Sequence, residues 1–130
     1  MYKGTIESDI TVAANTLIPF KTEINSNSNT TPVENSNSVA INNTGYYNIS
    51  VMMTVTDVAT TNVTMDLTAN NTPIASTSTD ITADTGIVAL HLNDVERVAI
   101  APTAEKVKIG VVLNAAATVS EAILIIEKVR

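Results

Sequence analysis

The sequence predicts an all-β protein: an antiparallel β-sandwich in a single domain. Apolar and polar residues alternate with a period of two through most of the chain after residue 39, as expected for half-buried strands. Turn-forming segments recur at roughly ten-residue spacing, which is typical of sandwiches and barrels. Val, Ile and Thr are abundant, and their β-branched side chains favour a pleated surface.

The chain has 130 residues, the usual size of one domain, and its 45% hydrophobic content is enough to form a buried core. We expect residues 1–9 to form an N-terminal arm with little to pack, and residues 10–130 to form the single folded domain. The arm has no apolar run resembling a signal peptide, and no later segment is long enough to cross a bilayer. The sequence therefore predicts no membrane partner.

The first predicted strand is Ile10–Phe20, and the Asn-, Ser- and Thr-rich segment 23–37 reads as a loop. Further strands are predicted over residues 39–58, 62–69, 74–81, 87–100, 106–115 and 120–130, with turns at 59–62 and 70–73. The last strand is apolar on both faces at its centre, which predicts burial of both faces.

Alternation along these strands also predicts which side chains form the core. The predicted core residues are Tyr47, Ile49, Val51, Met53, Val63, Met65, Leu67, Val88, Leu90, Leu92, Ile109, Val111, Leu113, Ile123 and Ile125. Tyr46 and Met52 lie on the opposite face of their strand, where an aromatic and a methionine suggest either a contact surface or a covered one.

Four pieces of the sequence, in this order, point to a known family. They are Gly45-Tyr46-Tyr47 opening a long strand, the hairpin segment 67–71 (LTANN), the segment 90–98 (LHLNDVERV) and a hydrophobic strand that ends near residue 130. Their order and spacing resemble the trimeric jelly roll of the C1q and tumour-necrosis-factor type. The resemblance covers about two thirds of the chain and implies a homotrimer whose threefold axis is lined by the sheet containing the terminal strands.

A second observation agrees with a homotrimer. A monomer would expose the second apolar face of the last strand, together with Ile87, as a patch larger than soluble monomers usually tolerate. Closed threefold symmetry hides such a strip. The residues expected near the axis are Tyr46, Tyr47, Val112, Leu124 and Ile126.

The short, Thr- and Asn-rich, cysteine-free form is similar to head-fibre and capsid-decoration proteins of tailed bacteriophages, and to trimeric heads on bacterial spores. Since no stalk-like tract precedes the first strand, we expect a capsid decoration protein or head fibre. It would be made in the bacterial cytoplasm and located on the virion surface, with the major capsid protein as partner. Met1, Tyr2 and Lys3, or the loop at 25–37, are the expected attachment points.

The alternative is a carbohydrate-binding or receptor-binding head that attaches to a surface glycan. Sugar sites usually contain exposed aromatic side chains, and only three Tyr and one Phe are present, so the structural role is favoured. The charge of −6, with seven scattered basic residues, argues against a nucleic-acid partner.

Catalytic chemistry is not predicted. The only histidine is His91, in the middle of a strand; there is no cysteine, and the four glycines form no phosphate-binding loop. We therefore expect no enzymatic activity and no cofactor.

Metal binding is weakly suggested at two places. Asp80 with Asp84, or Asn93 with Asp94 and Glu96, could supply oxygen ligands for Ca²⁺. Neither group matches an EF-hand loop, and acidic residues in turns commonly bind backbone amides instead. No metal ligand is therefore predicted.

Overall fold

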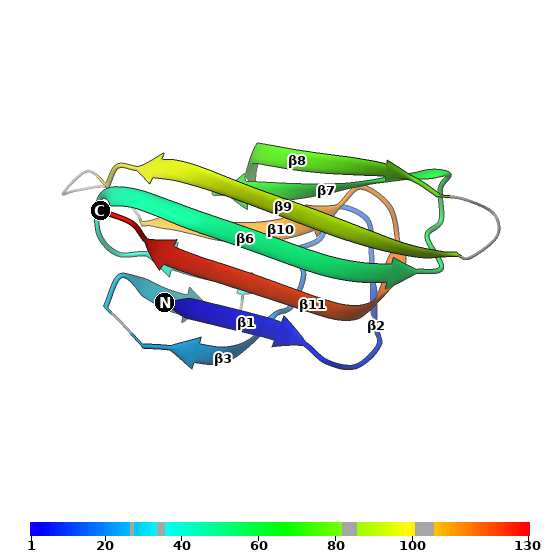
Figure 1. The fold of residues 1–130 in the computed structure, drawn as a ribbon, viewed down its shortest axis with the longest axis horizontal. Coiled ribbons are helices and arrows are strands. Elements are labelled where there is room, and N and C mark those ends of the chain that lie inside the picture. Colours follow the sequence, from blue (N-terminus) through cyan, green and yellow to red (C-terminus); the bar gives the residue numbers. More distant parts are fainter. Residues whose placement is uncertain (27, 34–35, 82–85, 101–105) are drawn as a thin grey trace.

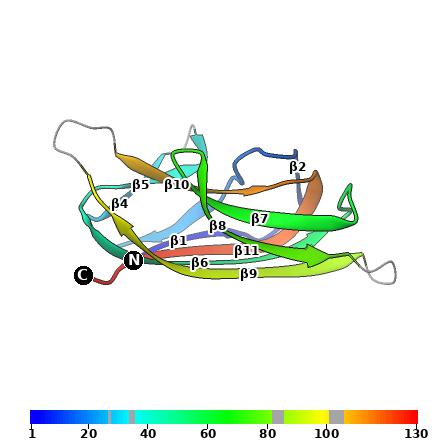
Figure 2. The same ribbon diagram turned by 90° about the horizontal axis from the view of Figure 1, so that it is seen from above.

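Two antiparallel sheets pack face to face in the computed structural model of the chain (Figures 1 and 2). The structure describes every residue except 27, 34–35, 82–85 and 101–105. The predicted all-β antiparallel sandwich is confirmed. None of the described residues forms a helix long and apolar enough to cross a membrane.

The sheet nearer the viewer in Figure 1, here called the front sheet, has the strand order β3-β1-β11-β6-β9, with β2 paired to β11. Its strands are β1 (Tyr2–Ile6), β2 (Ile10–Val12), β3 (Lys21–Asn25), β6 (Gly45–Thr56), β9 (Ile87–Val98) and β11 (Ala117–Lys128). The two strands nearest the chain ends, β1 and β11, lie side by side in this sheet.

The second layer, here called the back sheet, has the order β4-β5-β10-β7-β8. Its strands are β4 (Thr30–Val33), β5 (Ser38–Ile41), β7 (Asn62–Ala69), β8 (Thr72–Asp80) and β10 (Val107–Leu113). The predicted turn between β7 and β8 is confirmed: Asn70 and Asn71 have φ of 51° and 67°, a left-handed pair that asparagine tolerates in tight hairpins.

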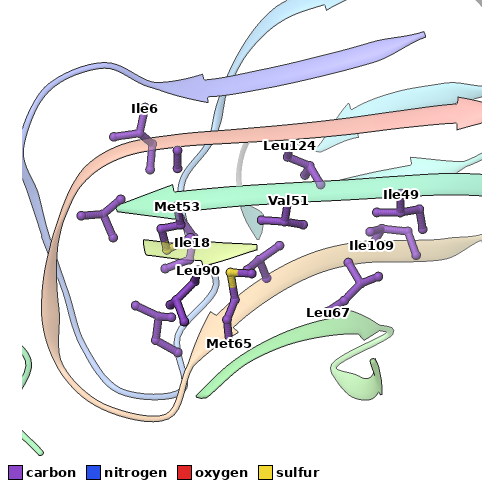
Figure 3. Close-up of a cluster of buried hydrophobic side chains, with 14 of the residues drawn as sticks. Ile6, Ile18, Ile49, Val51, Met53, Met65, Leu67, Leu90, Ile109 and Leu124 are labelled. Carbon is purple, nitrogen blue, oxygen red and sulfur yellow. The ribbon is translucent and has the colours of Figure 1, made fainter. Parts of the chain in front are cut away.

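The core lies between the sheets, where the period-two pattern places alternate side chains of each strand. Figure 3 shows Val51 of β6 and Leu67 of β7 pointing into the same space. Most of the predicted core is confirmed as buried: Tyr47, Ile49, Val51, Met53, Val63, Met65, Leu67, Val88, Leu90, Ile109, Val111 and Leu113. Leu92 is half-buried and packs against this cluster.

The prediction for β11 was wrong about which face lies in the core. Ala117 and Val119 point inward, but a register shift between Val119 and Glu121 adds one residue to β11 relative to β6. Such a bulge reverses the alternation beyond it, because successive side chains of a strand point to opposite faces. The inward set is therefore Ala122, Leu124 and Ile126, and the half-buried outward set is Ile123 and Ile125.

The prediction of an N-terminal arm at residues 1–9 was also wrong. Residues 2–6 form β1, which pairs with β11 on one side and β3 on the other. The inward positions of this strand are Tyr2, Gly4 and Ile6, and the Tyr2 side chain is 2% exposed. Five residues with a glycine in the middle give too short an alternation to be recognised as a strand in the sequence.

Two further strands lie in or beside the segment predicted as a loop. All five residues of β3 are exposed, so β3 is held by its backbone pairing to β1 and shows no hydrophobic pattern. β4 pairs with β5 at the edge of the back sheet. The long first strand predicted at Ile10–Phe20 is reduced to the three residues of β2 and an isolated bridge between Leu17 and Val112.

Candidate interaction surface

The outer face of the front sheet carries large apolar side chains that the sandwich itself does not bury. Met52 is 54% exposed, and Ile87 and Val95 are each 58% exposed. These residues alternate with buried or half-buried residues of β6 and β9, so they point away from the core. The outward orientation predicted for Tyr46 and Met52 is confirmed, at 37% exposure for Tyr46.

The register of the sheet brings Met52 together with the half-buried outward side chains of β11. Met52 of β6 is paired with Ile123 of β11 on one side and with His91 of β9 on the other. In the row two residues further along β11, Ile125 is paired with Ser50. We call Met52, Ile123 and Ile125 the outer-face patch. A shallow hollow of about 190 Å³ borders it, lined in part by Met52, His91 and Ile123.

Charged and polar side chains surround the patch on the same face. Lys3 and Thr5 of β1 are paired with Ile125 and Ile123, respectively. Lys3 also forms a 3.5 Å ion pair with Glu23 of β3. An apolar centre with a charged edge is the usual anatomy of a protein–protein contact.

Tyr46 lies at the end of this face where the chain terminates. Its backbone N–H donates to the Arg130 carbonyl at 2.8 Å, and its carbonyl accepts from the Val129 N–H at 2.7 Å. The Arg130 guanidinium lies 5.0 Å from the Tyr46 ring centre, within the range of a cation–π interaction. The C-terminal residues are therefore fastened to the start of β6.

Of the five residues predicted at the threefold axis, only Tyr46 is exposed on this face. Leu124, Ile126 and Tyr47 are buried between the sheets, with exposures of 0 to 1%. The bulge in β11 explains the first two. Val112 is half-buried on the outer face of the other sheet, where it forms a bridge with Leu17.

The sequence analysis assigned Tyr47 both to the core and to the threefold axis. The structure confirms only the core assignment. Its hydroxyl donates to the Asn43 carbonyl at 2.6 Å. Burial raises the pKa of Tyr47, and the hydrogen bond to Asn43 partly opposes that rise. Its role is in the core and not at a surface.

The residues predicted for attachment are part of the front sheet. Tyr2 is buried in the core, and burial raises the pKa of its hydroxyl. The Met1 amino group donates to Ser26 Oγ at 3.3 Å, and Lys3 pairs with Glu23. Met1 and Lys3 are half-buried and reach solvent only at the sheet surface, so none of the three belongs to a free arm.

The acidic residues considered as metal ligands do not converge. Asn93 points outward, whereas Asp94 and Glu96 point to the inner side of β9. Asp80 Oδ1 accepts a hydrogen bond from Asn62 Nδ2 at 2.9 Å, and Asp84 lies outside the described residues. Within the described part of the chain, no three His, Asp or Glu side chains are grouped as a metal site would require.

Asp94 and Glu96 instead form an acidic pair near the sandwich edge. Hydrogen bonding to Asp94 raises the pKa of Glu96, and burial and the negative charge of Asp94 raise it further. His91, the candidate base considered in the sequence, is exposed on the outer face beside Met52.

No protein-family model and no curated protein matches this chain. A solved structure, the Eiger TNF from S. frugiperda, superposes with a TM-score of 0.76 at 8% sequence identity. The match covers 99% of this chain and 93% of that chain. At this identity the likeness concerns the fold. The chain therefore has the jelly-roll fold of the tumour-necrosis-factor type, as the sequence motifs predicted.

Proposed function

We propose that the chain is a non-enzymatic structural protein that assembles as a homotrimer through the outer face of the front sheet. The observation that carries this proposal is the outer-face patch, with Met52 at its centre and 54% exposed. Contiguous apolar side chains on the surface of a soluble protein often mark a contact site. Three copies around a threefold axis bury such a strip with closed symmetry, which also prevents open-ended association.

The position of the patch supports the same assembly. It lies on the sheet that contains β1 and β11, which is the sheet that the family resemblance expects at the axis. Met52 and Ile123 are directly paired, and Ile125 lies in the next row of β11 on the same face, so the three side chains form one continuous surface on paired strands. A rigid, preformed surface loses little conformational entropy on association.

We further propose that the trimer decorates or extends a bacteriophage capsid, as a head fibre or decoration protein. On this proposal the chain is made in the bacterial cytoplasm, and its partner on the virion is the major capsid protein. The support is the short, Thr- and Asn-rich, cysteine-free sequence on a jelly-roll fold. The alternative, a receptor-binding head that recognises a surface glycan, is supported by a polar pocket described in the next subsection.

A binding experiment separates the two roles. Purified chain is mixed with capsids stripped of their decoration proteins and, separately, with bacterial cell-wall glycans, and each mixture is sedimented. Saturable co-sedimentation with the capsids is the expected result. Retention by the glycans without capsid binding would favour the receptor-binding role, and loss of both would contradict the virion proposal.

A further inference from the structure

The outer face of the back sheet contains a polar pocket of about 310 Å³. Its floor is a row across three adjacent strands. Gly110 of β10 is paired with Thr68 of β7, and Ser38 of β5 lies on the other side of Gly110, next to the pair formed by Ile109 and Val39. Because Gly110 has no side chain, the Leu17 side chain lies directly over this row. A Cβ at this position would lie 3.3 Å from Thr68 Oγ1 and would collide with the Leu17 side chain.

Each side of the pocket offers a different kind of contact. Leu17 provides an apolar wall, and Ser36 and Lys108 line other sides. The turn between β7 and β8 adds Asn70 and Asn71. Asn70 Oδ1 accepts the Lys108 backbone N–H at 2.9 Å, which fixes the orientation of the Asn70 amide.

Thr68 is the observation that points to a ligand. Its residue is only 2% exposed, and among the described residues its Oγ1 has no hydrogen-bond partner. The neighbouring Ser38 hydroxyl, by contrast, shares a 2.7 Å hydrogen bond with Ser36. Buried hydroxyls in native proteins almost always have a partner. Leu17, which lies over Gly110, is the side chain that would turn aside for a polar group in the pocket to reach Thr68 Oγ1.

The lining defines the chemistry of that group. Hydroxyl and amide side chains both donate and accept, as the hydroxyls of a sugar do. Leu17 can contact the apolar face of a sugar ring, and Lys108 has the one charged side chain among the described residues that line the pocket. Ligand pockets range from about 300 to 1,000 Å³, so this pocket accommodates a single ring. We propose that the pocket binds one carboxylated sugar residue, such as a hexuronic acid, with Lys108 pairing with the carboxylate.

This site lies on the sheet opposite the outer-face patch and is formed within one chain. It therefore goes beyond the proposed structural role and does not depend on it. A homotrimer joined through the front sheet would leave three such pockets on its exterior. Three linked sites bind a polymeric glycan more tightly than one site does.

The test uses nuclear magnetic resonance of the ¹⁵N-labelled full chain. Methyl β-D-glucuronoside is titrated in, with methyl β-D-glucoside and sodium acetate as comparison ligands. Saturable shifts of the Gly110, Thr68 and Lys108 amides with the glucuronoside, at an affinity about tenfold above either comparison ligand, are expected. Equal binding of acetate would show a simple anion site and overturn the proposal, as would the absence of shifts at these amides.

Two variants assign the contacts. Thr68→Val keeps the side-chain shape and removes the unpartnered hydroxyl, so the fold should remain as stable as before or become more stable, while glucuronoside affinity falls about tenfold. Lys108→Met should lower glucuronoside affinity to that of the glucoside. If Thr68→Val binds the glucuronoside like the parent chain, the pocket is not the site.

Matched controls lie on β7 and immediately before β10. Thr64→Val also removes an outward hydroxyl of β7, but that hydroxyl pairs with Ser78 at 2.7 Å. Lys106→Met also removes one positive charge, from a side chain that donates to Asn42 at 2.8 Å. Both controls should bind like the parent chain. The mass of the assembly, measured on the same samples, reports on the trimer separately from sugar binding.

Discussion

Glu96 lies beside Asp94 on the inner side of β9, where the hydrogen bond, burial and the neighbouring charge all raise its pKa. The unfolded chain keeps the ordinary glutamate pKa, so the folded state holds this proton more tightly. The resulting stabilisation is fully present below the ordinary value, and it is lost as pH rises through the raised pKa of the folded state. Above that pH the fold retains a charge pair that repels.

We therefore predict that Glu96→Gln raises the urea midpoint of unfolding at pH 7. At a pH below the ordinary glutamate pKa, the variant and the parent chain should have nearly the same midpoint, because Glu96 is then protonated in both states. Urea titrations followed by far-ultraviolet circular dichroism at pH 4 and pH 7 measure this. Glu127→Gln, on the outward face of β11, is the control for removing a negative charge. A lower midpoint for Glu96→Gln at pH 7 would contradict the argument.

At the scale of the element, β1 differs most from its sequence-based prediction. A tyrosine buried at 2% exposure is a core residue, and replacing a large aromatic core residue with alanine typically costs about 3–5 kcal/mol. We predict that Tyr2→Ala lowers the free energy of unfolding by about that amount. Lys3→Ala, which removes only an exposed ion pair, should change it by about 0–1 kcal/mol. Denaturant titration of both variants measures the difference.

Deleting residues 1–8 should have a larger effect than either substitution. The deletion removes β1, leaves one edge of β11 unpaired and uncovers part of the core around Leu124. We predict that the truncated chain loses cooperative unfolding, which calorimetry detects. A truncated chain that still unfolds cooperatively near the parent temperature would show that β1 is the detachable arm the sequence suggested.

β11 shows why one part of the surface could not be predicted from sequence. The residues Ser120 and Glu121 carry no glycine, proline or other signal that marks a bulge, and period-two counting assumes that no bulge exists. A single extra residue therefore exchanged the inward and outward sets of an otherwise well-predicted strand. By contrast, the twelve-residue alternation of β6 has no interruption, and its faces were predicted correctly.

At the scale of the whole molecule, the fold class and most of the core were predictable because long strands repeat one simple pattern. The β3 edge strand could not be predicted, because pairing through the backbone leaves no pattern in side-chain polarity. The polar pocket could not be predicted from the sequence either, because Ser38, Gly110 and Thr68 are far apart in sequence and meet only through strand register. Of the five residues predicted at the threefold axis, only Tyr46 lies on the outer face of the front sheet.

A variant that tests the homotrimer must leave the core intact. Leu124→Asp would place a carboxylate in the core and unfold the chain, whatever its assembly. Met52→Lys and Ile123→Lys instead alter the outer-face patch, where three copies of each charge would meet near the axis and repel. Ser76→Lys, on the exposed outer side of β8, adds the same charge away from that face and is the matched control.

We predict that native mass spectrometry of the parent chain and of Ser76→Lys gives three times 13.7 kDa. Met52→Lys and Ile123→Lys should give 13.7 kDa while keeping the far-ultraviolet spectrum of a β protein, because both substituted side chains already reach solvent in the single chain. A parent chain that remains at 13.7 kDa at micromolar concentration would mean a monomer and end the proposal. A trimer that survives both patch substitutions would place the contact on another face.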